Sequence, residues 1–414
     1  MASLPPKSLL IFTQVFPPDP AAVGQYMLDA AVAMQRRGHR VRVFTANRGY
    51  ENPTLQYAAR EIIDGVEVHR LPFSSFGKKP IYKRLLGTIS FMLQCFWITL
   101  TTRRTGGILF STSPPMIGFV LSIAALLRRV PSAYWAMDLN PDQLIALRKI
   151  SASSLTARVL EAVNRFILKR TSLVIALDRF MADRLRQRAT LDKKMVVIPP
   201  WPHERYISDL EIATNPFRAT HNLAGKFVVM YSGNHTASNP LATLLEATLA
   251  FKDDTDLIFA FVGGGLGKSG VETFIHEHRL TNVISIPYQP LADLRHSLSA
   301  ADVHVVSLGA ELVGIVHPCK IYSAMAVARP ILFFGPNPSH ISDLLEGHSF
   351  GWQIAHGEVA KTVETLRQLR SLPIEQLHGM GKLAHAVLHD GLSQENLCGR
   401  FCDALETHLH LQVA

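Results

Sequence analysis

The feature of this chain that most constrains its fold is a repeated alternation of short apolar runs with longer amphipathic stretches. The apolar runs have the length of buried strands, and the stretches between them have the spacing of helices. In the first half the predicted strands are Leu9–Val15, Arg40–Ala46, Ile108–Ser111, Ser132–Met137 and Leu173–Ala176. Because helical crossovers join parallel strands, the pattern predicts a parallel sheet with helices on both faces.

The alternation pauses at Met195–His203, where three prolines are typical of a semi-rigid linker. It then resumes, with predicted strands at Phe227–Tyr231, Leu257–Val262, Val283–Ile286, Val303–Leu308 and Ile331–Phe334. A chain of 414 residues is long enough for two domains. We therefore predict an α/β protein with two doubly wound domains, residues 1–202 and 203–387. A last helix at Ser393–His408, within the segment 388–414, could pack on either domain.

Charge is divided unevenly between the two halves of the chain. Residues 1–200 hold 28 Lys and Arg against 12 Asp and Glu, a net charge of +16, whereas residues 201–414 hold 14 against 21, a net charge of −7. The basic half should therefore face an anionic partner, such as a membrane surface, a phosphorylated lipid or nucleic acid. Aromatic side chains interleaved with the basic ones are sparse, which disfavours nucleic acid.

One segment of the basic half bears on a membrane. Residues Leu85–Thr102 carry no charge and lie between Lys83-Arg84 and Arg103-Arg104. Their number is near the minimum for a transmembrane helix, but several are Ser, Thr or Gln. Three alternatives stay open: a membrane span, a buried helix of the domain, and a helix in the membrane interface with its basic ends on lipid headgroups.

Cysteine usage and the N-terminus indicate the compartment. Cys95, Cys319, Cys398 and Cys402 have no metal-ligand spacing, which favours reduced thiols in a cytosolic protein. The N-terminal apolar run, Leu9–Phe16, is only as long as a strand, so we expect no secretory signal.

The block Val316–Pro330 predicts a phosphate site. It joins the last two predicted strands through a short helix of small and apolar residues. Pro318 suits the first turn of that helix, and the next amides, at Cys319 and Lys320, would point outward as an anion site. Lys320 adds a positive charge beside them. The alternative is a surface lysine near a helix start, which the helix dipole disfavours.

Other candidate residues follow predicted strands, because ligands of doubly wound sheets bind outside the carboxyl ends of the strands. They are Gly24 and Asp138 in the first half, and Gly233, Asn234, His235, Gly263, Gly264, Gly265, Tyr288 and Gln289 in the second. Gly24 would let a diphosphate approach a helix start, or is a plain helix cap. Asp138, near Asp142, could orient an acceptor or cap the next helix. His235 and His317 could each donate to phosphate or be structural.

The glycine run at Gly263–Gly265 could wall a nucleobase, cradle phosphate or be a simple loop. Its continuation, Gly263-x3-Gly267-Lys268-Ser269, resembles a phosphate loop of NTPases but is one residue short of that spacing. We therefore disfavour an NTPase.

Together these motifs resemble the retaining nucleotide-sugar glycosyltransferases of family 4, which have the GT-B fold. The resemblance is closest to the branch that acts in capsule, O-antigen and colanic-acid type polysaccharide assembly. The stretches that carry it are Phe16–Pro20 with Gly24, Arg37–His39, Tyr231–His235, Phe261–Gly265, Ile286–Gln289, Ser299–Val303 and Pro318–Pro330. The resemblance implies two Rossmann-like domains that face each other across a cleft.

The resemblance also implies roles for the candidate residues. In the second domain Gly263, Gly264, Gly265, Tyr288 and Gln289 would hold the nucleobase. The diphosphate would be held by Asn234, His235, Lys320 and the amides near Pro318 and Cys319, with Gly24 closing from the other domain. Gly233 and His317 are further donor-binding candidates. The basic first domain would take the acceptor, such as a polyprenyl-diphosphate-linked sugar. Family 4 enzymes need no metal, since helix dipoles and cations stabilise the leaving nucleotide diphosphate.

The sequence departs from the family pattern in two places. The family has two glutamates eight positions apart, and the aligned residues here are Ile315 and Ser323, with Glu311 out of register. Asn234-His235 replace the usual phosphate-binding arginine. Either a sub-branch uses Lys320 and the donor-facing Ser323 instead, or the site is weakened.

We therefore expect a metal-independent, retaining glycosyltransferase without a cofactor, with Lys320 and Asp138 as catalytic candidates. It would move a sugar from a nucleotide-diphosphate sugar, with UDP favoured over GDP, to a lipid-linked or saccharide acceptor in cell-surface polysaccharide biosynthesis. It would be cytoplasmic and peripheral at the inner face of the plasma membrane. Two alternatives stay open: a nucleotide-sugar 2-epimerase of the same fold, and a non-catalytic nucleotide-sugar or lipid-binding partner in a polysaccharide assembly complex.

Overall fold

The computed structural model describes residues 7–19, 21–49, 54–76, 81–202 and 214–412, so Pro20 and His203 of the motifs above lie outside the described residues. The chain divides into two compact units: unit 1, Met1–Pro200 with Glu395–Ala414, and unit 2, Trp201–Gln394. The sequence places this division two residues later. It also places residues 388–394 with the C-terminal segment, whereas the structure keeps them in unit 2.

Unit 1 is built on an eight-stranded sheet with the order β3-β4-β2-β1-β5-β6-β7-β8. Its strands are β1 (Ser8–Phe12), β2 (Arg40–Ala46), β3 (Arg60–Ile63), β4 (Val66–Leu71), β5 (Thr105–Phe110), β6 (Ser132–Trp135), β7 (Leu173–Ala176) and β8 (Met195–Val197). Neighbouring strands run parallel except β3 and β4, which pair antiparallel at one edge. The strands β1, β6 and β7 are buried along their whole length, as expected for a sheet covered on both faces.

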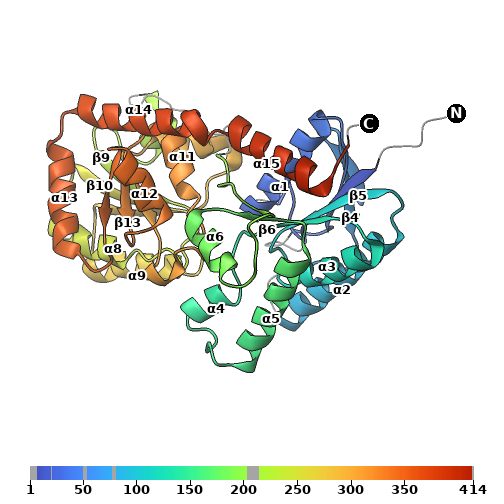
Figure 1. Cartoon of the computed structure of the whole chain (residues 1–414). Helices are drawn as coiled ribbons and strands as arrows, with labels where there is room; N and C mark the ends of the chain where they lie inside the picture. The colour runs from blue at the N-terminus through green and yellow to red at the C-terminus, as the bar shows by residue number, and fades with distance from the viewer. Residues whose placement is uncertain (1–6, 20, 50–53, 77–80, 203–213, 413–414) are drawn as a thin grey trace. The chain divides into compact units, whose positions relative to one another are not determined.

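Helices cover both faces of this sheet. They are α1 (Ala22–Arg36), α2 (Ile81–Thr101), α3 (Ile117–Arg128), α4 (Asp142–Ala146), α5 (Leu155–Arg170), α6 (Arg179–Arg186) and α15 (Gln394–Leu409). The helices α2, α3 and α5 pack in that order on one face, while α1 and α15 lie on the other (Figure 1). Unit 1 is therefore a doubly wound sheet, as the first half of the sequence predicts.

The last helix, α15, packs within unit 1. Arg37, just after α1, donates to Glu406 at 3.0 Å, and His39 pairs with the same carboxylate at 2.8 Å. Phe401 packs on Trp135 with ring centroids 4.3 Å apart. The Arg-Gly-His motif thus holds the C-terminal helix in place.

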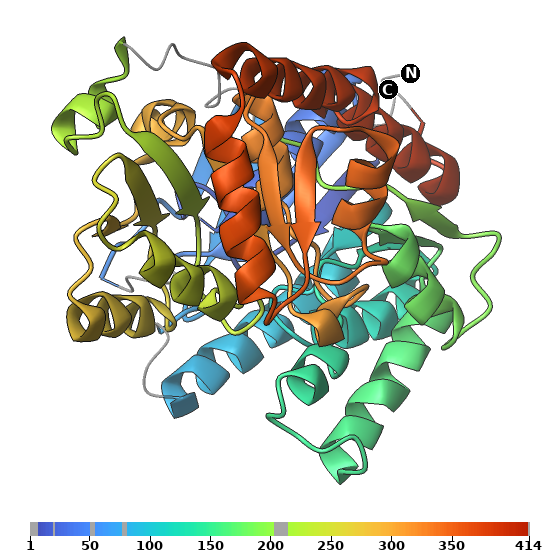
Figure 2. The ribbon, with the colours of Figure 1, turned by 90° about the vertical axis from the view of Figure 1, so that its left-hand side faces the viewer.

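Unit 2 is a second doubly wound sheet, with the all-parallel order β11-β10-β9-β12-β13-β14. The strands are β9 (Phe227–Ser232), β10 (Leu257–Val262), β11 (Val283–Ile286), β12 (Val303–Ser307), β13 (Ile331–Phe334) and β14 (Gly351–Ile354). The helices are α7 (Pro216–Thr220), α8 (Ala242–Thr248), α9 (Lys268–His278), α10 (Leu294–Ser299), α11 (Lys320–Ala326), α12 (His340–Gly347), α13 (Val359–Ser371) and α14 (Ile374–Gly391). Figure 2 looks onto this unit, in which α8 packs with α13, and α11 with α14.

Most predicted strands are confirmed, and those at β2, β7, β10, β11 and β13 have the predicted bounds. The sequence pattern does not reveal β3, β4, β8 or β14, because these edge or near-edge strands are short or mix apolar with polar residues. The prediction of a linker from residue 195 is wrong for Met195–Val197. These residues form β8 and extend the sheet of unit 1 beside β7.

The uncharged segment Leu85–Thr102 lies almost wholly within α2, which is neither fully buried nor fully exposed. Its buried stripe consists of Gly87, Phe91, Cys95 and Thr99, at helical spacing, on the side that packs against the unit. The opposite side exposes large apolar side chains. Within the described residues, Tyr82–Thr101 is the one stretch of helix that is long and apolar enough to cross a membrane by length and composition.

Candidate functional site

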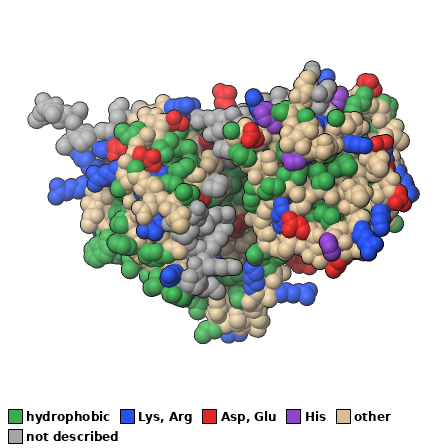
Figure 3. Space-filling model, turned by 180° about the vertical axis from the view of Figure 1, so that it is seen from behind, with side chains coloured by type: hydrophobic (Ala, Val, Ile, Leu, Met, Phe, Trp, Pro, Cys, Tyr) green, Lys and Arg blue, Asp and Glu red, His purple; other side chains and the backbone are tan. Residues whose placement is uncertain are grey.

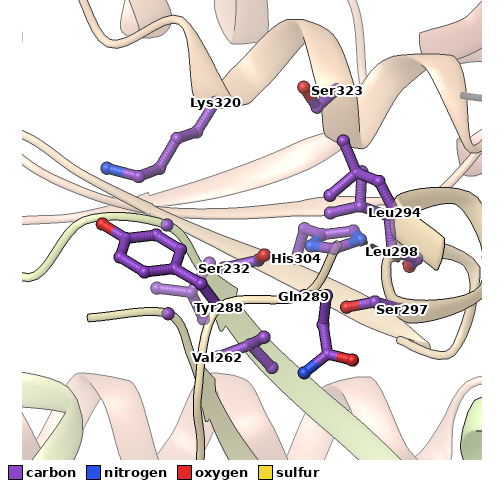
Figure 4. Close-up of a pocket in the computed structure, with 13 residues that line it drawn as sticks. Ser232, Val262, Tyr288, Gln289, Leu294, Ser297, Leu298, His304, Lys320 and Ser323 are labelled. Atoms are coloured by element: carbon purple, nitrogen blue, oxygen red, sulfur yellow. Dashed lines mark hydrogen bonds between the residues drawn. The ribbon is translucent and has the colours of Figure 1, made fainter. Parts of the chain in front are cut away.

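The candidate donor pocket lies in unit 2 at the carboxyl ends of β9, β10 and β12 (Figure 4). It has a volume of about 180 Å³. Of the residues that the sequence singles out, the structure brings together six in its wall: Gly233, Gly263, Tyr288, Gln289, Lys320 and Ser323. Ser232 and Val262, which also line it, lie within the motifs Tyr231–His235 and Phe261–Gly265. No sequence motif pointed to the residues that complete the wall, which are Leu294, Ser297, Leu298, His304 and Val305.

Lys320 is the cation of this pocket. It is the first residue of α11, and its ammonium nitrogen lies 5.0 Å from the centroid of the Tyr231 ring. Figure 4 shows the side chain extending from its helix toward the strand ends. Burial lowers the pKa of Lys320 to about 8, because the ammonium group loses hydration. A bound anion would restore the full charge, so the residue is suited to hold a phosphate.

Gly233 makes room for Lys320. Its φ is +139°, and a Cβ atom built there would lie 2.2 Å from Cε of Lys320. Any other residue at this position would be strained and would also displace the lysine side chain. The glycine after β9 is therefore required by the position of the cation.

The start of α11 differs from the sequence prediction. The helix begins at Lys320 with Cys319 as its N-cap, so Pro318 precedes the cap and is not in the first turn. The Cys319 amide donates to the His317 carbonyl at 3.0 Å, so it does not point outward. The anion site thus depends on Lys320 rather than on a row of amides from Pro318 and Cys319.

His317 lies outside the wall of the pocket. Its Nε2 is 2.8 Å from the Tyr322 hydroxyl, which in turn is 2.9 Å from Nε2 of His340. The hydrogen bonds and ring contacts of this group favour the structural alternative for His317.

Asn234, His235, Gly264 and Gly265 form the loops beneath the pocket rather than its wall. Nδ1 of His235 lies 3.2 Å from the Gly264 carbonyl oxygen, and its Nε2 has no hydrogen-bond partner among the described residues. Burial lowers the pKa of this histidine, so its ring is neutral at pH 7. Asn234 is exposed and accepts a hydrogen bond from the Tyr231 hydroxyl on its carbonyl at 2.8 Å.

The end of the pocket away from Lys320 combines Gln289 with residues of α10 and β12, whereas Tyr288 lies on the Lys320 side (Figure 4). The Ser297 hydroxyl is fully buried and has no hydrogen-bond partner among the described residues. His304 contacts the Leu298 carbonyl at 2.9 Å, and burial lowers the pKa of His304 to about 4. Leu294 and Leu298 add apolar surface. This end offers a flat, mostly apolar wall with a neutral donor, which suits a nucleobase.

Of the two positions where the family has glutamates, only one lies in the wall of the pocket. Ser323 lies on α11 in the wall of the pocket, whereas Ile315 is buried. Glu311 is exposed on the short 3₁₀ turn Ala310–Leu312. The structure therefore leaves a hydroxyl where the second glutamate of the family stands.

A second pocket, of about 370 Å³, lies in unit 1 around the ends of β5 and β6. It is lined by Asp138 together with Arg84, Tyr134, Asn140 and Asn164, and by apolar residues of α3, α4 and α5. Burial raises the pKa of the Asp138 carboxyl to about 6. Asp138 does not cap α4, whose N-cap is Pro141 with no side-chain hydrogen bond. The alternative that it faces a ligand is therefore the one that the geometry favours.

The remaining candidates of unit 1 have structural partners. Asp142 pairs with Arg188 at 2.5 Å. Gly24, in the first turn of α1, donates its amide to Ala21, and a Cβ there would lie 3.0 Å from the Phe16 backbone. Gly24 is thus needed to seat the start of α1 on the loop after β1.

Two other sequence patterns also have structural explanations. The lysine of the sequence that resembles a phosphate loop, Lys268, has a structural role. It donates to the carbonyls of Gly263 and Ile286, both at 2.6 Å. Among the residues that the structure describes, no cluster of three or more His, Cys, Asp or Glu could hold a metal ion. The Asp-x-Asp sequence at Asp254–Asp256 lies before β10, and its carboxylates pair with Arg370 and Lys226.

Comparison with known proteins identifies the class of the chain. Residues 21–201 match the family model described as "Glycosyl transferase 4-like domain". The chain is similar to the "Probable glycosyltransferase WbjE" of Pseudomonas aeruginosa, with 24% identity over 364 residues. The match covers 87% of this chain and 88% of that protein. It is also similar to the "Putative colanic acid biosynthesis glycosyl transferase WcaI" of Escherichia coli (strain K12), with 24% identity over 339 residues. This match covers 77% of this chain and 81% of that protein.

These matches show a glycosyltransferase whose first half resembles the family 4 model. Solved structures agree on its fold. Sucrose-phosphate synthase from Thermosynechococcus elongatus matches with a TM-score of 0.75 at 16% identity over 97% of this chain and 99% of that one. Anabaena Alr3699/HepE in complex with UDP and glucose matches with a TM-score of 0.72 at 16% identity, over 97% and 100%. The predicted GT-B fold with two Rossmann-like domains is therefore confirmed. The predicted glycosyltransferase class is confirmed by the family model and the two relatives.

Proposed function

We propose that this glycosyltransferase belongs to family 4 and moves a sugar, with retention and without a metal ion, from a nucleotide-diphosphate sugar to a lipid-linked or saccharide acceptor. The process would be the biosynthesis of a cell-surface polysaccharide. The name of WcaI supports that process, and the complexes of Anabaena HepE with UDP and UDP-glucose support a UDP sugar over a GDP sugar.

The observation that carries the proposal is Lys320 in the strand-end pocket of unit 2. A partly dehydrated ammonium group lies across a glycine at the end of β9, in a pocket whose other end is neutral and mostly apolar. A nucleoside diphosphate has the matching arrangement of an anionic diphosphate and a flat base. Ser323 lies beside Lys320 on α11 and would contact the ribose or the sugar.

In the proposed reaction the bond between the sugar C1 and the β-phosphate oxygen breaks, and a bond from an acceptor oxygen to C1 forms on the same face. The acceptor proton passes to the departing phosphate. Lys320 stabilises the negative charge that grows on the diphosphate as it leaves, a role that a fixed cation performs most strongly in a site with little water.

The pocket of unit 1 is our candidate for the acceptor. Asp138 would accept a hydrogen bond from the acceptor hydroxyl and hold it in the reactive orientation. Arg84 would contact the phosphate of a lipid-linked acceptor, and the apolar wall would contact its first isoprenoid carbons. We propose further that the enzyme acts at the inner face of the plasma membrane, and that Gly24 approaches the donor diphosphate during the reaction.

The test is the thermal stability of the protein with UDP, GDP, ADP or NAD in the presence of EDTA. A ligand at a hundred times its dissociation constant stabilises a protein by about 2.7 kcal/mol, which is a clear shift in Tm. We expect a shift with UDP that survives EDTA. A folded protein that shifts with none of the four nucleotides would overturn the donor assignment, and a shift with UDP only after addition of a divalent metal would overturn metal independence.

A further inference from the structure

The helix α2 presents an apolar stripe that the donor and acceptor pockets do not use. Tyr82, Leu85, Leu86, Ile89, Leu93 and Trp97 recur at intervals of one, three and four residues, and each is about half exposed or more, up to 62% for Trp97. At 100° per residue they lie within one third of the helix circumference. The stripe contains no charged residue and is opposite the buried stripe of Phe91 and Cys95.

The neighbouring helix α3 extends this surface. Arg128 of α3 donates to the carbonyls of Leu100 and Thr102, so the C-terminal ends of the two helices lie together. Leu126 and Leu127, just before Arg128, are 50% and 63% exposed. We call the exposed apolar residues of α2 together with Leu126 and Leu127 the α2–α3 face. Hydrophobic side chains gather on the lower part of unit 1 when it is seen from behind (Figure 3).

The charge around this face has a single sign. No Asp or Glu occurs in the 70 residues between Glu67 and Asp138, whereas nine Lys and Arg do. Lys83 and Arg84 near the start of α2, Arg103 after its end and Arg129 after the end of α3 are all exposed. An apolar stripe bordered by cations at both ends is the pattern of a helix that lies in the interface of an anionic bilayer.

We propose that the α2–α3 face docks the enzyme on an anionic lipid bilayer, with α2 lying along the membrane plane. The leucines and Trp97 enter the boundary between headgroups and acyl chains, and Lys83, Arg103 and Arg129 contact lipid phosphates. A second copy of the chain does not complement this face, because its own α2–α3 face would bring two sets of cations together without an acidic partner.

The docking surface leads to the pocket of unit 1. Arg84, near the start of α2, and Met116, before α3, both line that pocket, so its rim is continuous with the N-terminal end of the docking surface. This part of the inference rests on the proposed function: a lipid-linked acceptor could pass its headgroup from the bilayer into the pocket while its tail stays in the membrane.

Co-sedimentation with vesicles of phosphatidylcholine, with and without phosphatidylglycerol, tests the docking surface. We expect the protein to bind the vesicles that contain phosphatidylglycerol and to be released by salt. The double variant Leu93→Glu/Trp97→Glu should bind at least about tenfold more weakly, because it places two carboxylates in the interface. The matched control is Ile62→Glu, an equally exposed apolar position on β3 beside Glu61 and Glu67, which should bind like wild type.

A second pair of variants separates charge from apolar contact. Lys83→Ala and Arg103→Ala should each weaken binding to phosphatidylglycerol vesicles about fivefold, since a cation near an anionic surface contributes ~1 kcal/mol. Circular dichroism confirms that each variant is folded.

The Tm shift with UDP, measured on every variant, keeps this test separate from the proposed function. Loss of vesicle binding with an unchanged UDP shift supports the docking surface. Vesicle binding by the double variant at the level of wild type overturns it, as does a folded wild-type protein that binds no vesicles. A wild-type dimer that the double variant converts to a monomer also overturns it, because a second copy would then cover the face.

Discussion

The two pockets of the enzyme each bury one ionisable side chain, and the two side chains have opposite charges. In unit 2 a lysine loses water and burial lowers its pKa to about 8, whereas in unit 1 an aspartate loses water and burial raises its pKa to about 6. Both groups are thus held closer to neutrality than they are in water, because burial removes water from the charged form. A bound partner of the right kind would remove each cost: an anion at Lys320 and a hydroxyl donor at Asp138.

The pockets also differ in what builds them. The smaller pocket of unit 2 is made at strand ends, where Gly233 and Gly263 remove side-chain bulk and a single cation supplies the charge. The pocket of unit 1 has about twice the volume and is lined by residues of α2, α3, α4 and α5 and of the loops after β5 and β6. A rigid backbone cradle suits one invariant ligand part, such as a diphosphate, and a larger side-chain pocket suits an acceptor that varies between enzymes.

The largest effect on activity should come from Lys320→Met, which keeps most of the length of the side chain and removes its charge. We expect the transfer rate to fall about 100- to 1,000-fold, as when a group that stabilises transition-state charge is lost. Turnover of a UDP sugar on a membrane-extracted acceptor measures it. Lys382→Met, on the exposed side of α14, is the matched control and should leave the rate unchanged. A normal transfer rate for Lys320→Met would show that Lys320 does not stabilise the leaving diphosphate.

Asp138→Asn should separate stability from activity in unit 1. The pKa of Asp138 is raised in the folded state, so its ionisation destabilises the fold progressively as pH rises from about 4 to about 6, and fully above that range. The variant should therefore be more stable by ~1–3 kcal/mol at pH 7, with no gain at pH 3.5. Transfer should fall about 100-fold, because the acceptor hydroxyl loses its partner.

Urea unfolding at the two pH values and a transfer assay measure both effects. Asp192→Asn, at an exposed position, is the control for the charge change. A less stable Asp138→Asn variant would mean that the carboxylate has a structural partner.

The affinity for UDP should depend on pH through Lys320. The free protein holds this ammonium with a pKa of about 8, and a bound diphosphate raises it, so the protonated form binds more tightly. The dissociation constant should be constant well below pH 8 and rise above it, by up to about tenfold per pH unit. Titration calorimetry from pH 6.5 to pH 9.5 measures this trend. The same rise in Lys320→Met would assign the pH dependence to another group.

Gly233→Ala should have the smallest effect of the four. The new Cβ would meet Cε of Lys320 at a positive φ, so we expect a loss of about 1–3 kcal/mol in stability and about tenfold in UDP affinity. Gly225→Ala is the matched control, because its φ is also positive, at +71°, but its Cβ meets nothing within 4 Å. It should lose stability without losing UDP affinity. Equal loss of affinity in both variants would argue against a specific link between Gly233 and Lys320.

The sequence predicts well what depends on local pattern. The apolar runs that form buried central strands are visible as such, and the rule that ligands lie at the carboxyl ends of parallel strands selects Gly233, Gly263 and Lys320 correctly for the pocket wall. The departure at Ser323 is visible as well, and the structure places it in the same wall.

What the sequence could not predict depends on how elements pack. Ser297 and His304 line the pocket from α10 and β12 without any motif, because only the packing of α10 against the sheet brings them there. The outward amide expected at Cys319 is used by the His317 carbonyl, since the helix begins at Lys320, two residues after the proline. The composition of α2 likewise does not reveal which of its sides is exposed, because an apolar helix can be buried on every side or on only one.

The central claim is that donor and acceptor are held by different residues, Lys320 and Asp138. The most direct test is calorimetric titration of UDP, in EDTA at pH 7, into Lys320→Met and Asp138→Asn side by side with wild type. The account predicts a dissociation constant at least about tenfold higher for Lys320→Met, since a charge-assisted hydrogen bond contributes ~1.5–3 kcal/mol, and an unchanged constant for Asp138→Asn. Wild-type affinity in Lys320→Met, or an equal loss in both variants, would contradict it.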